Sequence, residues 1–191
     1  MPTIRLAAAG DAAAIADIYN QGIADRGATF ETELRTAEQI AVRLRDTEWP
    51  LLVVTEGPAV LGWAGLSRYR PRACYAGIAE FSIYLDRSAR GRGLGRDLLQ
   101  ALTDEARRRG FWKLVSRIFP FNAASRALCR AAGFREVGVY EKHGCLDGQW
   151  LDVVIVERLI PENQASGATG TSGRHSGPTA TEAYTSKRRD A

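Results

Sequence analysis

The sequence predicts an α/β fold in which a mixed β-sheet carries helices on its faces. Segments with the two-residue alternation of strands and segments with the three- and four-residue spacing of helices follow one another along the chain. Read in order, they give β-α-α-β-β-β-α-β-α-β-β. The composition agrees, because 45% hydrophobic and 25% charged residues in a chain of 191 are typical of a globular protein. The length suits one domain and an extension.

The first elements are a short strand at 3–7 and a helix at 12–24, which Asp11 is placed to cap. Thr36 and Gln39 stand three residues apart, the pattern of a capping box at the start of a second helix. The apolar stripe expected on the first helix consists of Ile15, Ile18, Tyr19 and Ile23.

A hairpin and a further strand are expected next. Strands at 51–56 and 59–69 flank Gly57 and Pro58, which favour a turn. The strand at 77–86 leads into a glycine-rich segment and then a helix. The apolar stripe of that helix consists of Leu94, Leu98, Leu99 and Leu102.

The last part of the body contains a strand at 112–118 and a helix at 122–134, which Gly133 closes in a left-handed conformation. Two strands, 135–146 and 149–159, flank the turn dipeptide "DG" and form a final hairpin.

One domain is therefore expected over residues 1–162. The segment 163–191 is rich in Gly, Ser, Thr and Ala and nearly free of large apolar side chains. Such a segment buries too little surface to offset its ordering entropy, so we expect a disordered tail.

Several functional classes are disfavoured. A net charge of +4 without a basic, aromatic-rich stripe argues against a nucleic-acid partner. No apolar run approaches the roughly 18 residues of a membrane span. Three cysteines (Cys74, Cys129 and Cys145) have neither metal spacing nor an even number, so we expect no metal and no disulfide framework. A cytoplasmic location is the simplest expectation.

The segment "RGRGLG" (90–95) lies between a predicted strand and a predicted helix. Helix N-termini present free amides and partial positive charge, and glycines allow a close approach, so a phosphate group fits there. The alternative is a tight, solvated loop whose arginines face water. The segment lacks the Gly-Lys-Ser/Thr of a P-loop, and no acidic strand end follows as in a dinucleotide site.

Two motifs resemble the GNAT superfamily of N-acetyltransferases, and the resemblance covers roughly residues 2–160. "RGRGLG" fits the pattern Arg/Gln-x-x-Gly-x-Gly/Ala, and "NAASRALCRAAGF" is similar to the family's Asn-x-x-Ser…Gly-Phe helix. The resemblance implies a twisted mixed sheet of about seven strands with about four helices, and acetyl-CoA as cosubstrate. It implies cofactor-binding roles for Ser82, Ile83, Tyr84, Arg90, Gly91, Arg92, Gly93, Leu94, Gly95, Arg96, Asn122 and Ser125.

Within the superfamily, "YRPRACYAGIAEFSIYL", "GATFE" and "GQWLDV" resemble phosphinothricin-type acetyltransferases. That group includes methionine sulfoximine and arsinothricin acetyltransferases, and the second half of the chain is most similar to the arsinothricin-resistance members. The resemblance implies acetylation of the α-amine of a small, anionic, glutamate-like amino acid, a role in resistance, and a homodimer. Ala76 stands where related enzymes often carry Arg, and the sequence does not separate the three substrates.

Glu80 matches the position of the family's proposed base. An amino-acid amine is mostly protonated at pH 7, so a carboxylate that accepts its proton is needed. We expect the apolar neighbours Ala79 and Phe81 to desolvate this carboxylate and favour its protonation. The alternative is a strand-end acid paired with an arginine.

The resemblance implies that Arg70, Arg72 and Tyr75 bind the anionic groups of the substrate, since arginine suits carboxylates and oxyanions. A solvated loop with exposed arginines is the alternative. Phe30 and Glu31 match a loop that covers the substrate, although Phe30 is equally compatible with an ordinary core position.

Cys129 stands where many members carry Tyr and the phosphinothricin type carries His, the acid that reprotonates the CoA thiolate. A cysteine with an ordinary pKa of about 8.5 could donate that proton. The alternative, slightly favoured, is a small buried residue with water as the donor. His143 receives no role.

These residues together predict direct acetyl transfer, in which a backbone amide near Ser82 or Ile83 polarises the acetyl carbonyl. Two alternatives stay open. One is transfer to another amine, such as a protein N-terminus, lysine, polyamine or aminoglycoside. The other is a CoA-binding sensor without catalysis.

Overall fold

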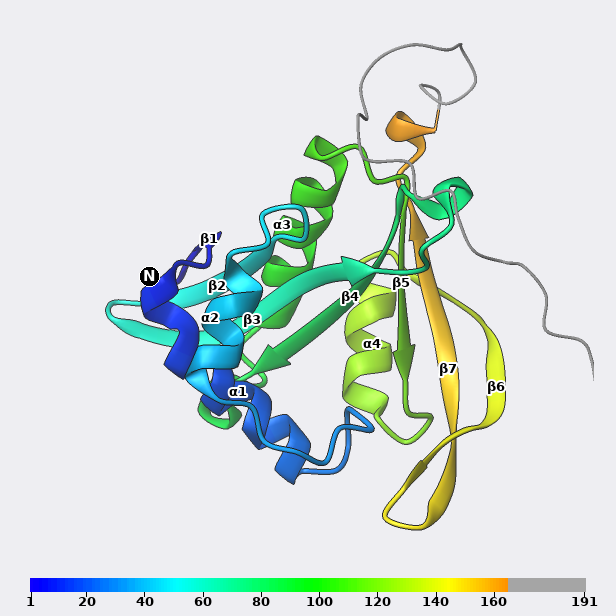
Figure 1. The fold of residues 1–191 in the computed structure, drawn as a ribbon, viewed down its shortest axis with the longest axis horizontal. Helices are drawn as coiled ribbons and strands as arrows, with labels where there is room; N and C mark the ends of the chain where they lie inside the picture. Colours follow the sequence, from blue (N-terminus) through cyan, green and yellow to red (C-terminus); the bar gives the residue numbers. More distant parts are fainter. Residues whose placement is uncertain (165–191) are drawn as a thin grey trace, which may run out of the picture.

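The computed structural model describes residues 1–164 and contains seven strands and four helices (Figure 1). The predicted order of strands and helices is confirmed. Their bounds are β1 (Thr3–Leu6), α1 (Ala12–Ala24), α2 (Ala37–Leu44), β2 (Leu51–Glu56), β3 (Ala59–Arg68), β4 (Ile78–Leu85), α3 (Leu94–Arg108), β5 (Lys113–Ile118), α4 (Ala123–Ala131), β6 (Arg135–Leu146) and β7 (Gln149–Leu159).

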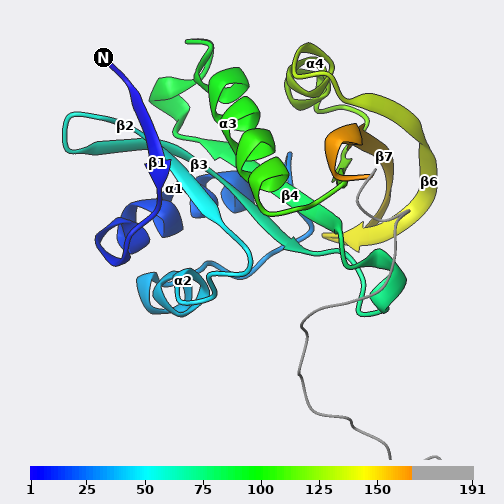
Figure 2. The same ribbon diagram turned by 90° about the horizontal axis from the view of Figure 1, so that it is seen from above.

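All strands belong to one sheet with the order β1-β2-β3-β4-β5-β7-β6. Every neighbouring pair is antiparallel except β4 and β5, which are parallel. Helices α1 and α2 cover one face, while α3 and α4 cover the other (Figures 1 and 2). The expected mixed sheet with helices on its faces is therefore confirmed.

The apolar stripes of the helices form the two sides of the core, as their spacing predicts. Leu98, Leu99 and Leu102 of α3 are fully buried against the sheet. On the opposite face, Ile15 and Ile18 of α1 are buried in the cluster that contains the β2 and β3 side chains. The sheet is thus held from both sides by side chains that water does not reach.

Local signals were right in most places and wrong in one. The side chains and backbones of Thr36 and Gln39 form the expected capping box, and Gly133 closes α4 with φ +80°. Asp11 does not cap α1 through its side chain. Its carboxylate instead accepts the Ala8 amide at 2.7 Å and pairs with Arg5, whose hydrogen bond lowers the pKa of Asp11.

Strands β4 and β5 are paired only at their beginnings. The parallel ladder contains three residue pairs, the last of which joins Glu80 and Val115. Beyond this pair the two strands diverge, and a gap opens between their C-terminal halves (Figure 1). Residues from the C-terminal halves of both strands line the candidate site described below.

The tail expected to be disordered, 163–191, lies outside the described residues from 165 onward. In residues 1–164 no helix has the length and apolar character to cross a membrane. The same part of the chain contains no group of three or more His, Cys, Asp or Glu side chains placed to hold a metal ion.

We predict that Gly22→Ala destabilises the protein by about 1–3 kcal/mol, although alanine normally favours a helix. A Cβ at Gly22 of α1 would stand 2.6 Å from a ring carbon of Tyr84. That ring cannot easily move, because it packs on Tyr19 at 4.8 Å and on Trp63 at 5.0 Å. Urea unfolding measures the change.

Gly10→Ala is the matched control, since a Cβ there meets no atom within 4 Å. We expect it to change the free energy of unfolding by no more than about 0.5 kcal/mol. Equal effects of the two substitutions would contradict the close packing of Tyr84 on α1.

Candidate active site

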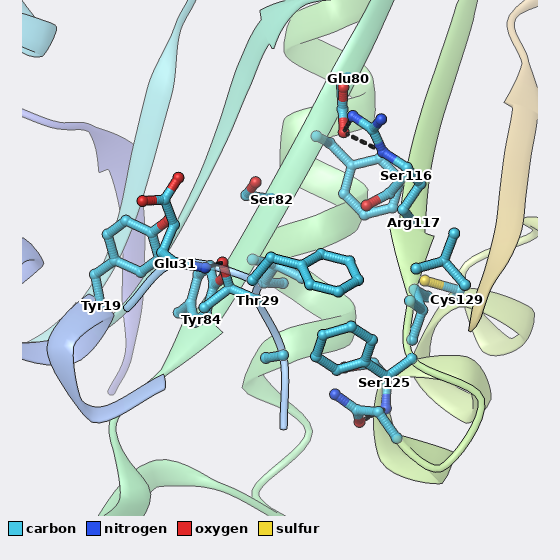
Figure 3. Close-up of a pocket in the computed structure, with 18 of the residues that line it drawn as sticks. Tyr19, Thr29, Glu31, Glu80, Ser82, Tyr84, Ser116, Arg117, Ser125 and Cys129 are labelled. Carbon is cyan, nitrogen blue, oxygen red and sulfur yellow. Dashed lines mark hydrogen bonds and ion pairs between the residues drawn. The ribbon is translucent and has the colours of Figure 1, made fainter. Parts of the chain in front are cut away.

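Two adjoining cavities lie at the gap between β4 and β5. We call the first, of about 310 Å³, the Glu80 cavity, and the second, of about 530 Å³, the glycine-loop cavity. The Glu80 cavity is drawn in Figure 3. Both cavities are lined by Ala28, Ile83, Tyr84, Asn122 and Ser125. These shared residues mark the passage from one cavity to the other.

The glycine-loop cavity contains a cradle of backbone amides. Gly91 (φ +78°) and Gly93 (φ +82°) adopt left-handed conformations that favour glycine. A Cβ at either position would meet no atom within 4 Å, so the space beside the loop is open. In residues 1–164 the amides of these two glycines have no hydrogen-bond acceptor. They precede α3, which begins at Leu94, so they form a ready anion-binding site at a helix N-terminus.

The arginines around this loop differ in their ion-pair partners and in whether they line the cavity. Arg90 lines the cavity and pairs with Asp25 at 3.0 Å. Arg92 makes two hydrogen bonds, of 3.1 and 3.0 Å, to the carboxylate of Glu56 and is not among the lining residues. Arg96 lines the cavity and takes no part in the ion pairs that hold Arg90 and Arg92. The cation most available to an anion is therefore Arg96 rather than Arg92.

Asn122 fixes the boundary between the cavities. Its side-chain oxygen accepts the amide of Ser125 at 3.0 Å and so caps α4. Its side-chain nitrogen donates to the carbonyl of Gly27 at 2.9 Å. One residue thus joins α4 to the loop that follows α1, and the predicted Asn-x-x-Ser motif has a structural role as well as a place in the lining.

The side chains of β4 alternate between the two faces of the sheet. Glu80 and Tyr84 point toward α1, while Ala79 and Phe81 are buried in the core beside α3 and α4. The expectation that Ala79 and Phe81 desolvate Glu80 is therefore wrong, because sequence neighbours in a strand face opposite sides. Burial does raise the pKa of Tyr84 above its ordinary value.

Glu80 is paired with an arginine, as the alternative for this position anticipated. Arg117 of β5 donates to Oε1 of Glu80 through Nε, at 3.1 Å, and through Nη2 (Figure 3). The two side chains reach toward each other from the diverging strands, and both line the Glu80 cavity. The carboxylate therefore lies in the site with its charge already compensated.

The backbone amides of β4 also alternate in direction along the strand, so that only some of them face β5. The Asp86 amide donates to Leu61 of β3 at 2.9 Å, and the Gly77 carbonyl accepts a bond from the segment entering β5 at 2.8 Å. The register between β3 and β4 is regular. Backbone groups of even-numbered residues therefore face β3 and those of odd-numbered residues face β5. Ser82 and Ile83 are the two residues whose backbone amides were expected to polarise a carbonyl group. The Ile83 amide is directed toward the gap, whereas the Ser82 amide is directed toward β3.

Cys129 lies in α4 at the edge of the Glu80 cavity and is only 2% exposed. Burial, with a smaller contribution from the charge of Glu136, raises the pKa of the Cys129 thiol to about 12. The thiol therefore stays protonated at neutral pH. This favours the interpretation of Cys129 as a small buried residue.

Phe30 belongs to both the cavity and a small core. Its ring meets that of Phe119 edge-on at 4.8 Å and leaves no room for a side chain at Gly144 of β6. The loop between α1 and α2 is thereby held over the cavity. Glu31 lines the same cavity and pairs with Arg35.

Three predicted substrate residues are not brought into either cavity. Arg70, Arg72 and Tyr75 lie in the connection between β3 and β4, and neither cavity lining contains them. Both arginines are exposed. Arg70 lies over the ring of Tyr69 at 5.2 Å, and Tyr75 meets the same ring edge-on at 5.9 Å.

Several lining residues were not assigned from the sequence. They are Tyr19, Thr29, Ser116, Arg117 and His143. The dipeptide "SR" was a signal for two of them, since it is polar and directly follows the apolar pair "LV" in a predicted strand. Using it requires knowing that this strand pairs with β4, and nothing local in the sequence specifies that partner.

Comparisons with known proteins agree with this geometry. Residues 15–134 match the model of the acetyltransferase (GNAT) family. A methionine sulfoximine/methionine sulfone acetyltransferase from Salmonella typhimurium is 35% identical over 87% of this chain and 99% of its own length. A phosphinothricin N-acetyltransferase from Alcaligenes faecalis is 32% identical over 83% of this chain and 82% of its own.

The fold comparison gives the same family. A GNAT superfamily phosphinothricin acetyltransferase from Sinorhizobium meliloti, solved in complex with acetyl-CoA, superposes with a TM-score of 0.78. It is 33% identical, and the match covers 83% of this chain and 88% of that one. Since the family match spans more than half of the chain and the relatives match nearly end to end, the chain belongs to the acetyltransferase (GNAT) family and is an N-acetyltransferase.

Proposed function

We propose that the protein transfers the acetyl group of acetyl-CoA to the α-amine of a small glutamate-like amino acid with a tetrahedral phosphorus, sulfur or arsenic centre in its side chain. Phosphinothricin, methionine sulfoximine and arsinothricin are the acceptors of this type, and detoxification is the corresponding role. One observation carries the proposal: a carboxylate, Glu80, lies in a cavity that adjoins an anion-binding glycine loop. Relatives named for such acceptors support the substrate class.

The residues present fit acetyl-CoA. The open amides of Gly91 and Gly93 and the charge of Arg96 suit a pyrophosphate. The passage beside Ile83 and Asn122 leads from there to the Glu80 cavity. Acetyl-CoA supplies the acetyl group as a thioester, so that a C–S bond is exchanged for a C–N bond and the CoA thiol and one proton are released.

The chain itself supplies a proton acceptor and a hydrogen-bond donor. Glu80 accepts the proton that the ammonium group of the acceptor must lose before its nitrogen can attack. The amide of Ile83, which faces the gap, donates to the acetyl carbonyl oxygen and stabilises the negative charge that develops there. Water is the proton donor for the sulfur, because the thiol of Cys129, with a pKa of about 12, gives up its proton poorly.

A second candidate is an acceptor without an anionic group, such as a protein N-terminus, a lysine or a polyamine. It is favoured by the positions of Arg70 and Arg72, which lie outside the Glu80 cavity and leave Arg117 as the arginine in its lining. The family match argues against the third alternative, a CoA-binding sensor without catalysis.

The homodimer and the cytoplasmic location stay predictions. The hairpin of β6 and β7 exposes Val139, Tyr140 and Trp150, which are 53%, 50% and 64% accessible. Such an apolar surface is compatible with a partner copy.

We predict that wild-type protein releases free thiol from acetyl-CoA with the three glutamate analogues. We expect none with glutamate, methionine, spermidine or a lysine peptide. Glu80→Gln should lower kcat/KM at pH 7 by about 10²- to 10⁴-fold, the usual contribution of a general base. The loss should shrink at higher pH, where more of the amine is already unprotonated.

Glu48→Gln serves as the control, because Glu48 is an exposed carboxylate outside both cavities and should leave kcat/KM unchanged. Turnover of the cationic acceptors alone would establish the second candidate. Binding of acetyl-CoA without turnover of any of these acceptors would contradict the proposed acceptor class.

We predict that Gly93→Ala raises the KM for acetyl-CoA at least tenfold while the KM for the acceptor changes little. Alanine is strained by about 1–2 kcal/mol in the left-handed conformation, and its methyl group would enter the anion cradle. Steady-state kinetics with each substrate varied in turn measures both constants.

Gly57→Ala is the matched control, since Gly57 also has a positive φ (+57°) with open space around it but lies in the turn between β2 and β3. Both substitutions should lower stability, and only Gly93→Ala should affect acetyl-CoA. A similar rise in the KM for acetyl-CoA in both variants would contradict the assignment of the glycine loop to the cofactor site.

We predict that Cys129→Ala keeps kcat within about threefold of wild type between pH 7 and 9, because a thiol with a pKa of about 12 neither donates readily nor forms a thiolate. Thiol labelling at pH 8, read by mass spectrometry, should modify exposed Cys74 and Cys145 but not buried Cys129. A hundredfold loss of kcat in a folded Cys129→Ala variant, or an acetyl group found on Cys129, would contradict this.

A further inference from the structure

We propose that Arg117 binds the α-carboxylate of the acceptor and that the Glu80–Arg117 ion pair is the element that recognises an α-amino acid. When the acceptor binds, its ammonium group takes the place of Arg117 beside Glu80, and its carboxylate takes the place of Glu80 beside Arg117. This inference rests on the proposed function, because it specifies how the same cavity selects its substrate.

The first support is the position of the pair. Glu80 extends from β4 and Arg117 from β5, at the point where the ladder between the two strands has ended (Figure 3). Both side chains line the Glu80 cavity. Arg117 is 45% exposed and Glu80 is 22% exposed, so both remain accessible from the cavity.

The second support is that neither group has another partner. Within residues 1–164, the guanidinium of Arg117 has no second carboxylate within 4 Å, and Oε2 of Glu80 makes no hydrogen bond. The two groups are therefore held by each other alone. A ligand that offers one charge of each sign can replace both contacts without leaving either group unpaired.

The third support is the chemistry of the ligand. An α-amino acid carries its ammonium and its carboxylate on one carbon atom, so the two charges lie as close together as those of Glu80 and Arg117. The planar guanidinium binds a carboxylate through two parallel hydrogen bonds. The tetrahedral group of a glutamate analogue is separated from the amine by three carbon atoms, whereas the α-carboxylate shares a carbon atom with the amine and is therefore the anionic group closest to it.

The exchange also prepares the base. In the pair, Oε1 of Glu80 accepts two hydrogen bonds from Arg117. Once Arg117 binds the carboxylate of the acceptor, Oε1 is free to accept the proton of the ammonium group. Proton transfer from the ammonium to Glu80 leaves an uncharged amine, and Arg117 keeps its charge throughout.

A purely structural role is the competing explanation, since the pair could hold β4 and β5 together where their ladder ends. Partly exposed ion pairs contribute little to stability, because solvent screens them. A structural clamp would affect every acceptor equally. A carboxylate-binding residue affects only acceptors that carry the carboxylate, and this difference makes the two explanations separable.

The test compares two acceptors that differ only in the α-carboxylate: phosphinothricin and its decarboxylated analogue, aminopropyl(methyl)phosphinic acid. For Arg117→Gln we expect kcat/KM with phosphinothricin to fall about 10- to 100-fold, the usual loss for a hydrogen bond to a charged group. With the decarboxylated analogue we expect a change of less than about threefold. Arg117→Lys should recover part of the loss, since it keeps the charge but not the paired hydrogen bonds.

Arg126→Gln is the matched control, because Arg126 makes a two-bond ion pair with Glu136 (2.9 Å each) outside both cavities. It should leave both acceptors unaffected. Equal losses with both acceptors in Arg117→Gln, or no loss with either, would overturn the role of Arg117 while leaving the proposed function intact. If wild type acetylates no α-amino acid at all, the proposed function fails, and the role of Arg117 fails with it.

Discussion

The rest of the site depends on the early end of the ladder between β4 and β5. Only three residue pairs join these parallel strands, and the strands then separate. Backbone groups that a longer ladder would pair, such as the amide of Ile83, are left facing the gap. The glycine loop before α3 and the carboxylate of Glu80 open into adjoining cavities, which share the end of β4 in their linings. The fold thus creates a passage for an extended ligand without interrupting the core on either side.

Contacts between residues far apart in the sequence stabilise the segments beside this gap. Asn122 joins the start of α4 to Gly27 in the loop after α1, and Phe30 packs that loop onto Phe119. At the other end, Asp25 pairs with Arg87, just before the glycine loop, and with Arg90, its first residue, and their hydrogen bonds lower the pKa of the Asp25 carboxyl. The loop between α1 and α2 is therefore attached on both sides of the gap. This arrangement explains why it lines both cavities although it has no regular secondary structure.

Patterns within a few residues of the sequence predicted the fold well. The environment of the site residues was predicted less well, because it depends on which strands and helices lie next to one another. Helix and strand order, the capping box and the final turn follow from spacing within a few residues. The capping role predicted for Asp11 was wrong, because the guanidinium of Arg5 is a stronger partner for the Asp11 carboxylate than the helix amides are. The environment of Glu80 was misjudged by treating sequence neighbours as spatial ones. Arg92 lies in the loop before α3 and Arg96 in the first turn of α3. Which of them faces the cavity depends on contacts with residues far away in the sequence, such as the ion pair of Arg92 with Glu56.

The charges around the gap follow one principle. Arg90 is paired with Asp25 beside the glycine loop, and Arg117 is paired with Glu80 in the other cavity. Each pair is partly exposed, so solvent screens it and its loss affects stability little. Each also holds a cation in the geometry that an anionic ligand requires, which reduces the entropy lost on binding. A lone cation would be equally attractive to any anion. A cation that must be exchanged from a carboxylate favours ligands that bring a positive charge for that carboxylate. At Glu80 this favours a zwitterion, and an α-amino acid is the simplest molecule that meets the requirement.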